Sequence, residues 1–464
     1  MIDFKNIKGI YFIGIGGIGM SALALYYARL GYIIAGYDRT RSSITENLSG
    51  IGCDLSYTDN ISTLPELFSE PSWKNSVLII FTPAVPAESK IFSYFRGNGY
   101  NIYKRSELLG EISSASDTIA VAGTHGKTTV STMTAHLLKQ SHVDCSAFLG
   151  GISKNYDSNL LLGKGSFTVM EADEFDRSFL RLSPLLAVIT AIDADHLDIY
   201  GDHQTMIEAY KEFCRKIRPG GTLLLNNRIK GRLGNFPGIT SLSYGHDPDA
   251  DFRSYEIQFS EGQYRFNMKT PAGIIYDLLF PFPGITNIEN LTAAIALALK
   301  CGVTEAEIRR AILSFRGVKR RFDIRVNLPG ITYIDDYAHH PEEISACIRS
   351  VRDYFTGRKL TGIFQPHLFS RTLEHAEGFA KSLDELDEVI LLPIYPAREK
   401  PVPGVTSELI FNKMKLANKR LLSKEDLPEL LDPQSLDVLI TIGAGDIDTL
   451  VTPIEKKLKE AVRE

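Results

Sequence analysis

The chain has 464 residues, and at roughly 150 residues per domain this length predicts about three domains. Hydrophobic residues make up 44% of the chain and charged residues 23%, so it is neither disordered nor fibrous. A formal net charge of -5 lacks the positive balance that binding to a nucleic-acid backbone usually needs, and we expect no nucleic-acid partner. The five cysteines are odd in number, scattered and never arranged as CxxC. They indicate neither a disulfide framework nor a zinc site, and a reducing cytoplasm fits them best.

The first notable element is an uncharged run over residues 9–28, long enough to span a bilayer or to imitate a signal peptide. Glycines interrupt this run at Gly14, Gly16, Gly17 and Gly19. They stand where a short strand over residues 10–15 would turn into a helix that begins near Met20. We therefore expect a soluble strand–turn–helix unit and no membrane insertion.

Gly14, Gly16 and Gly19 form the pattern GxGxxG, and Asp38 follows nineteen residues after Gly19 at the end of the apolar run YIIAGY. This is the fingerprint of a dinucleotide site, which on its own indicates an NAD-dependent oxidoreductase. The same geometry serves any ligand with a diphosphate and a ribose, because the glycines admit the pyrophosphate and the acid receives ribose hydroxyls. The identity of the nucleotide stays open at this point, as does a tight glycine turn without a ligand.

Along the whole chain, short apolar runs rich in Ile, Val and Phe alternate with helix-like stretches, which is typical of parallel α/β sheets. The segment ISSASD at residues 112–117 looks like a linker, and GVKRR at 317–321 follows a helical stretch. We therefore divide the chain into domains at 1–114, 115–317 and 318–464. Alternating patterning over residues 240–283 predicts an antiparallel edge or an added sheet within the middle domain.

The strongest local signal is a short strand over residues 119–122, the loop GTHGKTT at 123–129, and a helix over about 130–139. Such a unit directs backbone N–H groups and the positive end of the helix dipole at a phosphate. Lys127, expected to point into a solvated pocket, would neutralise the β- and γ-phosphates, and the Thr128 hydroxyl would ligate Mg²⁺. The strict pattern GxxxxGK[ST] is not met, because Val121 occupies the first glycine position. A glycine turn with a solvated lysine is the alternative.

Two acidic sites follow strands in the same domain. Glu171 ends an apolar strand that begins near residue 167, and Asp193, Asp195 and His196 follow a strand over 186–192. The carboxyl ends of parallel strands lie at the edge where ligands bind, so Glu171 could share a Mg²⁺ with Thr128. His196 could hold a second ion. Taken alone, each group also fits a solvated loop acid or a hydrogen-bonded histidine.

In the third domain, YIDDYAHHP at residues 333–341 is a strand that ends in acid, phenol and imidazole groups, and FQPH at 364–367, with Ser370 and Arg371, follows the next strand. Loops at neighbouring strand ends can converge on one ligand. The alternative is that these polar groups cap helices and carry no chemistry.

The chain carries, in this order, GIGGIGMSALA, GTHGKTT, EADEFDRSFL, ITAIDADHLDIYGD, ITNIENLTAAIA, GVKRRFD, DDYAHHPEEI, FQPH with SRT, and ITIGAGDI. This series, over about residues 9–447, resembles the Mur ligases. The resemblance implies a three-domain α/β architecture: a Rossmann-like N-terminal domain for a UDP sugar, a central P-loop ATPase domain, and a Rossmann-like C-terminal domain that closes over the site.

The resemblance also implies a bacterial cytoplasmic ligase of peptidoglycan synthesis, a monomer or weak homodimer, with ATP and Mg²⁺ as cofactors. ATP would phosphorylate a muramate carboxylate to an acyl phosphate, which an amino-acid amine would then attack. DDYAHHP and DADHLDIY favour the type that joins L-alanine to UDP-N-acetylmuramate over a related ligase that recycles a murein tripeptide. A dehydrogenase would leave the middle domain unexplained, and an NTP-driven switch would leave the glycine fingerprint unexplained.

The resemblance implies these site residues. ATP would be bound by Gly123, Thr124, His125, Gly126, Lys127, Thr128, Thr129, Asn287, Asn290 and Arg321. The UDP sugar would be bound by Gly14, Gly16, Gly17, Ile18, Gly19, Asp38 and Thr82. The incoming amino acid would be bound by Tyr337, His339 and Arg371. The metal ligands would be Thr128, Glu171 and His196, and the catalytic residues Lys127, Glu171, His196 and Arg320.

Two positions depart from the family pattern. Leu368 stands where many members have arginine after FQPH, which places more weight on Arg371. Some relatives carry a carbamylated lysine that bridges the metals; Lys211 lies in roughly that region, but Tyr210 could equally occupy the position, and we do not assign the modification.

Overall fold

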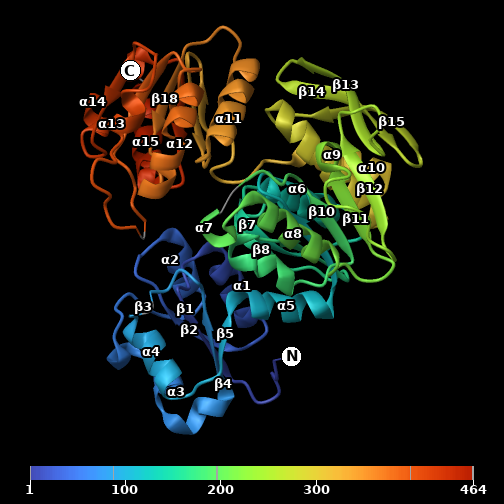
Figure 1. The fold of residues 1–464 in the computed structure, drawn as a ribbon, viewed down its shortest axis with the longest axis vertical. Helices are drawn as coiled ribbons and strands as arrows, with labels where there is room; N and C mark the ends of the chain where they lie inside the picture. The colour runs from blue at the N-terminus through green and yellow to red at the C-terminus, as the bar shows by residue number, and fades with distance from the viewer. Residues whose placement is uncertain (1, 87, 195–196, 398, 462–464) are drawn as a thin grey trace. The chain divides into compact units, whose positions relative to one another are not determined.

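The computed structural model describes residues 2–86, 88–194, 197–397 and 399–461 (Figure 1). The chain forms two compact units. The first comprises Met1–Ile257, Arg265–Leu279 and Glu289–Arg316, and the second Gln258–Tyr264, Phe280–Ile288 and Gly317–Glu464. In the described ranges the strands form three sheets of five, ten and six strands, and the α/β fold class that the sequence predicts is confirmed.

The N-terminal sheet is parallel, with the order β3-β2-β1-β4-β5. Its strands are β1 (Gly9–Ile13), β2 (Ile33–Tyr37), β3 (Asp54–Ser56), β4 (Val77–Phe81) and β5 (Ile102–Lys104). The helices are α1 (Ile18–Arg29), α2 (Ser43–Gly50), α3 (Glu66–Ser69), α4 (Lys90–Gly97) and α5 (Arg105–Ala115). The chain adds β2 and β3 on one side of β1 and then β4 and β5 on the other, so the glycine turn after β1 lies at the switch point where such sheets bind ligands.

The uncharged run near the N-terminus divides into β1 and α1, as expected. Its strand residues, such as Ile10 and Phe12, are fully buried in the sheet core. α1 covers only 12 residues. Within the described ranges, no helix is long and apolar enough to cross a membrane.

The prediction of a linker at residues 112–117 is wrong. α5 continues to Ala115 and β6 begins at Asp117, so only one residue separates helix and strand. The carbonyls of Ser113 and Ser116 accept hydrogen bonds from Arg218 at 2.6 and 2.8 Å. The small polar residues of this segment form the end of α5. The terminal carbonyls of this helix accept hydrogen bonds from the guanidinium of Arg218, which connects the helix to the middle domain.

The middle sheet has the order β15-β14-β13-β12-β11-β10-β6-β9-β7-β8. Its strands are β6 (Asp117–Ala122), β7 (Ser146–Ser153), β8 (Ser158–Leu161), β9 (Phe167–Glu171), β10 (Leu186–Ile189), β11 (Thr222–Asn226), β12 (Thr240–Gly245), β13 (Phe252–Ser260), β14 (Gln263–Thr270) and β15 (Gly273–Phe280). The helices are α6 (Lys127–Lys139), α7 (Leu197–Tyr200), α8 (His203–Cys214), α9 (Ile285–Lys300) and α10 (Glu305–Ser314). β6 lies between β9 and β10 and runs parallel to both, which places three candidate loops at one edge.

The added antiparallel strands begin later than predicted. β12 pairs parallel with β11 and with β13, so residues 240–245 still belong to the parallel sheet. β13, β14 and β15 are sheet neighbours joined by the short connections 261–262 and 271–272. Such connections join antiparallel strands only, so the antiparallel part of the predicted segment starts at Phe252.

The C-terminal sheet has the order β16-β17-β21-β18-β19-β20. Its strands are β16 (Asp323–Leu328), β17 (Ile331–Asp336), β18 (Leu360–Phe364), β19 (Glu388–Leu391), β20 (Lys419–Leu421) and β21 (Val438–Ile442). The helices are α11 (Pro341–Tyr354), α12 (Phe369–Leu383), α13 (Glu408–Phe411), α14 (Leu427–Leu430) and α15 (Val451–Ala461). β16, which the sequence analysis did not identify, is antiparallel to β17, and the other strands are parallel. β21 lies between β17 and β18, so the loops after these three strands meet at one edge.

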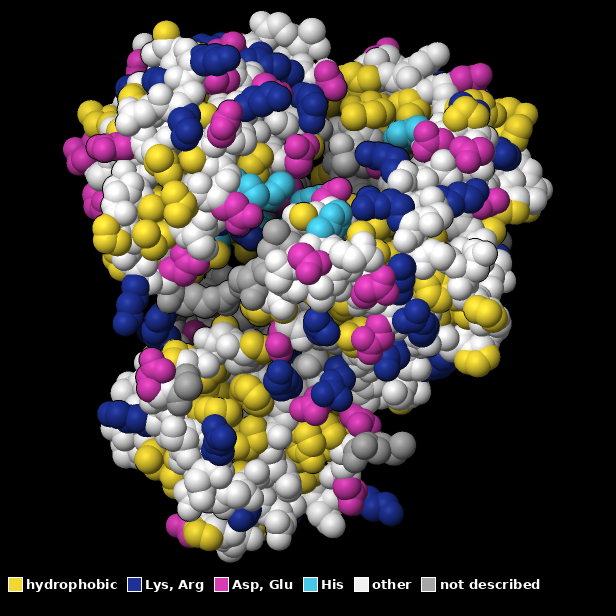
Figure 2. Space-filling model, in the orientation of Figure 1, with side chains coloured by type: hydrophobic (Ala, Val, Ile, Leu, Met, Phe, Trp, Pro, Cys, Tyr) yellow, Lys and Arg dark blue, Asp and Glu magenta, His cyan; other side chains and the backbone are white. Residues whose placement is uncertain are grey.

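All five cysteines are free thiols. Lys and Arg side chains alternate with Asp and Glu over the face drawn in Figure 2, in keeping with the slightly negative net charge.

Candidate functional site

The loop after β6 has the predicted strand–turn–helix form. Gly123 and Gly126 adopt φ of +127° and +80°, values that favour glycine, and Gly126 caps α6. The end of β10 braces the loop: the Thr124 amide donates to the Ala191 carbonyl at 3.1 Å, and the Thr190 hydroxyl donates to the His125 carbonyl. The turn is thus fixed with the N-terminus of α6 directed as an anion site requires.

Lys127, the first residue of α6, is not in a solvated pocket, and that expectation is wrong. Its side chain is 15% exposed, and its Nζ donates to the Gly123 carbonyl at 2.6 Å and to Glu174 Oε1 at 2.7 Å. Burial by itself would lower the pKa of Lys127, but the carboxylates of Glu174, Asp173 and Glu171 outweigh it and raise that pKa. The lysine is therefore a firmly charged group at the phosphate loop.

Asn290 on α9 lies against the same loop. A Cβ built on Gly126 would lie 2.9 Å from Asn290 Oδ1. Asn287, three residues earlier, instead donates to the Pro283 carbonyl at 2.6 Å. Of the two asparagines predicted to bind the nucleotide, the structure places Asn290 beside the phosphate loop.

Glu171 ends β9 directly beside the phosphate-loop strand, in register with Val121. Its carboxylate packs over the backbone of β7, where a Cβ on Gly150 would lie 2.2 Å from Oε2. Thr128, in the first turn of α6, is 6% exposed. The carboxylate and hydroxyl are hard oxygen donors of the kind that Mg²⁺ prefers, so these residues fit the predicted ion. Among the described residues there is no cluster of three or more His, Cys, Asp or Glu that could hold a metal, and Asp195 and His196 lie outside the described residues.

The glycine loop of the N-terminal sheet is held by the predicted acid. Asp38 Oδ2 accepts from the Gly16 amide at 2.8 Å, and Oδ1 accepts from the Thr40 amide at 3.0 Å. Gly14 has φ of +85°, and a Cβ there would lie 2.9 Å from Thr82 Cγ2. Gly17 then caps α1, which begins with Ile18. The structure brings these predicted residues together, and it shows Asp38 bonded to the loop backbone.

In the C-terminal sheet, the loop after β17 carries Tyr337 and His339. Their rings lie 5.3 Å apart, and His339 Nδ1 lies 3.0 Å from the Tyr337 carbonyl. Burial and the nearby charge of Arg371 lower the pKa of His339, against an opposing effect of Glu343. The three residues predicted to surround an amino acid are therefore gathered at one sheet edge, with the imidazole favoured in its neutral form.

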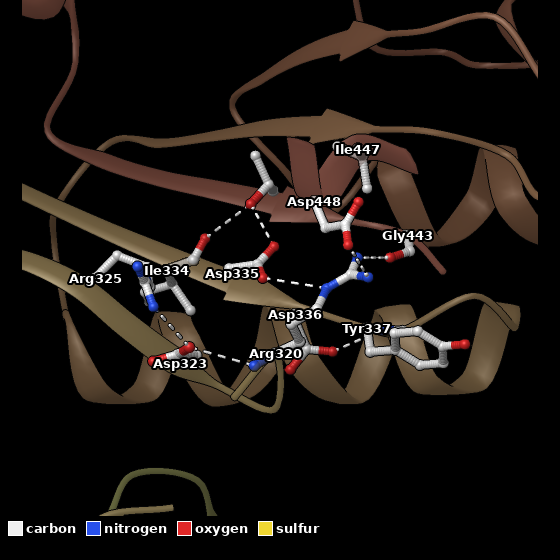
Figure 3. Close-up of polar contacts among 12 residues, drawn as sticks. Arg320, Asp323, Arg325, Ile334, Asp335, Asp336, Tyr337, Gly443, Ile447 and Asp448 are labelled. Atoms are coloured by element: carbon white, nitrogen blue, oxygen red, sulfur yellow. Dashed lines mark hydrogen bonds and ion pairs between the residues drawn. The ribbon is translucent and has the colours of Figure 1, made fainter. Parts of the chain in front are cut away.

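Arg320 precedes β16 and takes part in a network of polar contacts, drawn in Figure 3. Its guanidinium donates to the Gly443 carbonyl at 2.6 Å and lies 3.4 Å from Asp335 and 3.7 Å from Asp448. Burial raises the pKa of Asp335 to about 6, although Arg320 opposes the rise. Arg320 and Arg321 both lie 5.0 Å from the Tyr337 ring centre. The arrangement joins the ends of β17 and β21 beside the predicted amino-acid site.

Three domain models match the chain in sequence. The Mur ligase family catalytic domain matches residues 9–117, the Mur ligase middle domain residues 121–298, and the Mur ligase glutamate ligase domain residues 320–445. The chain belongs to the Mur ligase family. This Mur ligase therefore carries the three domains of the family in the order that the motifs predict.

Individual relatives resemble this Mur ligase over its whole length. The UDP-N-acetylmuramate–L-alanine ligase of Phocaeicola vulgatus is 47% identical over 455 residues, which cover 98% of each chain. Among solved structures, a UDP-N-acetylmuramate-alanine ligase from Thermotoga maritima has a TM-score of 0.81 at 27% identity, covering 98% of this chain and 99% of the other. A murein peptide ligase from Psychrobacter arcticus has a TM-score of 0.70 at 22% identity, covering 98% of each chain, and shares the fold.

At the departures from the family pattern, this Mur ligase shows local contacts. Leu368 caps α12 with φ of +68°, and its amide donates to the Tyr395 carbonyl at 2.9 Å. Lys211 pairs with Glu208 at 2.8 Å, and Tyr210 is fully buried against Phe179.

Sequence reasoning missed two residues of this Mur ligase that bind candidate site groups. Glu174 is fully buried and pairs with Lys127, and Arg105, the first residue of α5, lies beside Gly19 and pairs with Asp173. The signal for Glu174 was its place three residues after Glu171 in EADE. Arg105 forms a basic pair with the preceding Lys104, near the end of the predicted first domain.

Proposed function

We propose that this Mur ligase joins L-alanine to the carboxylate of UDP-N-acetylmuramate, with ATP as the phosphoryl donor, in peptidoglycan precursor synthesis. The observation that carries the proposal is the phosphate loop with the charged Lys127 at its helix terminus, beside Glu171 at the end of the next strand. Full-length similarity to relatives named for the L-alanine reaction supports the choice of substrates.

In the first half-reaction, the substrate carboxylate would take the γ-phosphoryl group of ATP and become an acyl phosphate. Such a transfer needs charge neutralisation and in-line positioning more than covalent help from the protein. Lys127 and the amides at the N-terminus of α6 supply positive charge where negative charge spreads over the phosphoryl oxygens. Thr128 and Glu171 would hold Mg²⁺, which neutralises phosphate charge when bound.

In the second half-reaction, the amine of L-alanine would attack the acyl carbon and release phosphate. Arg371 would pair with the amino-acid carboxylate, while Tyr337 and His339 border the amine. L-Alanine arrives with a positively charged ammonium group, which must lose a proton before it can attack, and the neutral form that burial favours for His339 adds no repulsion toward that group. Arg320 and Arg321 are expected at the phosphates during turnover.

Cellular context follows from the same proposal. A nucleotide-sugar substrate, ATP and five free thiols fit the bacterial cytoplasm. We expect a monomer or a weak homodimer, which sedimentation at several protein concentrations would test.

The decisive assay measures ADP release in the presence of UDP-N-acetylmuramate while single amino acids are tested one at a time. ADP release that requires the UDP sugar and L-alanine together supports the proposal. Preference for a murein tripeptide over L-alanine would favour the recycling ligase, and release without either substrate would favour an NTP-driven switch. Absorbance of a bound nicotinamide would revive the dehydrogenase interpretation.

A further inference from the structure

Arg105 occupies the space beside the third glycine of the fingerprint. A Cβ built on Gly19 would lie 2.1 Å from Arg105 Nη1, closer than any real contact allows. Gly19 lies inside α1 and has an ordinary helical backbone, so a side chain here would meet the Arg105 guanidinium and force it to shift. The guanidinium of α5 thus lies directly against the first turn of the helix that follows the glycine loop.

On its other side Arg105 makes a loose ion pair. Its Nη2 lies 3.4 Å from Asp173 Oδ2, and the two side chains are 22% and 36% exposed. A pair of this length and exposure contributes little free energy. Asp173 also accepts from the Phe175 amide at 3.1 Å through its other oxygen, so the carboxylate keeps a partner if the arginine moves.

The neighbouring residue provides a contrast. Lys104 pairs with Asp176 of the same acidic segment at 2.9 Å. Both basic residues thus meet the segment that follows β9, and it is the Arg105 guanidinium that lies against Gly19.

We propose that Arg105 binds the diphosphate of the UDP sugar and exchanges Asp173 for that ligand. The inference rests on the proposed function. Residues 14–19 contain no lysine or arginine, so the loop itself offers only amides and the helix terminus to a doubly charged group. A guanidinium presents paired donors that match phosphate oxygens, and a phosphate is a stronger partner than the loosely held, partly exposed Asp173. Gly19 leaves the room in which this cation lies.

Calorimetry of the full chain with UDP-N-acetylmuramate tests the inference. Arg105→Ala should weaken binding about 10- to 150-fold, the usual range for a lost charge-assisted contact. Lys104→Ala, the matched control, should change it less than about twofold. ATP affinity and the denaturation midpoint should be the same in both variants, which a merely structural role of Arg105 would not allow.

A double-mutant cycle tests the role of Gly19. Gly19→Ala keeps Arg105 but displaces its guanidinium, so it should weaken UDP-sugar binding; Gly19→Ala combined with Arg105→Ala should bind no more weakly than Arg105→Ala alone. Equal binding by the Arg105→Ala and Lys104→Ala variants would overturn the inference, as would full additivity in the cycle. Wild-type protein that binds no UDP-N-acetylmuramate would instead refute the proposed function.

Discussion

The two candidate nucleotide loops of the first unit share one local architecture and differ in where their cation comes from. Each is a buried strand, a glycine turn with a positive φ, and a helix whose N-terminus faces the turn. The phosphate loop contains its own cation, Lys127, whereas the glycine loop has a cation beside it from another helix, Arg105 on α5. The source of the charge decides what a sequence can reveal, because a lysine inside the turn is part of a recognisable motif and a distant arginine is not.

A second contrast is how tightly the acidic segment after β9 pairs with the two cations. Glu174 is fully buried and holds Lys127 at 2.7 Å, while Asp173 is partly exposed and holds Arg105 at 3.4 Å. Adjacent residues thus make one tight pair and one loose pair. The comparison predicts that mutations at the phosphate loop affect both stability and chemistry, whereas those at the glycine loop affect binding.

The largest effect is expected for Lys127→Ala. Loss of the transition-state charge should reduce kcat at least about 100- to 1,000-fold. It also leaves Glu174 buried without its cation, and breaking a buried pair typically costs about 3–5 kcal/mol. Steady-state kinetics and chemical denaturation measure the two effects.

The double variant Lys127→Ala with Glu174→Gln separates the effect on kcat from the effect on stability. Removing the buried charge should restore much of the stability but none of the activity. Recovery of activity in the double variant would contradict the role assigned to Lys127.

Arg371→Ala should lower the alanine-dependent efficiency about 10- to 150-fold, because a charge-assisted contact to the carboxylate is lost. Arg371→Lys should rescue it poorly, since a point charge cannot reproduce a two-pronged contact. Acyl phosphate formation, measured by chemical trapping, should survive. If trapping falls as far as ligation while alanine affinity stays unchanged, Arg371 serves the phosphates.

Gly150→Val tests the position of Glu171. The new side chain would occupy the space of the Glu171 carboxylate, so the Mg²⁺ concentration for half-maximal activity should rise roughly tenfold or more. Gly97→Ala in α4, where a Cβ meets nothing within 4 Å, is the matched control and should behave as wild type. An unchanged Mg²⁺ requirement in a folded Gly150→Val protein would remove Glu171 from the metal site.

The smallest effect concerns pH and Asp335, whose pKa is raised from 3.8 to about 6 by burial. A raised carboxyl pKa means that the folded state binds the proton more tightly, so this group's contribution to stability is present below pH 3.8 and is lost as the pH rises through 6. Asp335→Asn should remove this loss and change the pH slope of the unfolding free energy by up to about 1.4 kcal/mol per pH unit in that window. Identical slopes in denaturation series of both proteins would contradict the account.

The sequence predicts the strand–turn–helix units well because each is local: the glycines, the apolar strand and the following helix stand within about twenty residues. It fails where long-range contacts decide. Residues 112–117 look like a linker until Arg218 supplies donors for the Ser113 and Ser116 carbonyls, and Lys127 looks solvated until Glu174 is brought against it. β16 escaped notice because it contains Arg325, which is neutralised by Glu455 and Asp323 only in the folded domain.

The central claim, that the two loops bind different nucleotides, is tested most directly by cross-titration of two variants with two ligands. In Gly16→Val the added side chain would crowd Asp38, whose carboxylate holds the loop, so calorimetry should show weaker UDP-N-acetylmuramate binding and unchanged ATP binding. Lys127→Ala should show the reverse, and NAD should bind neither protein with comparable strength. Tight NAD binding to the wild type that Gly16→Val abolishes, or loss of the same ligand in both variants, would contradict the account.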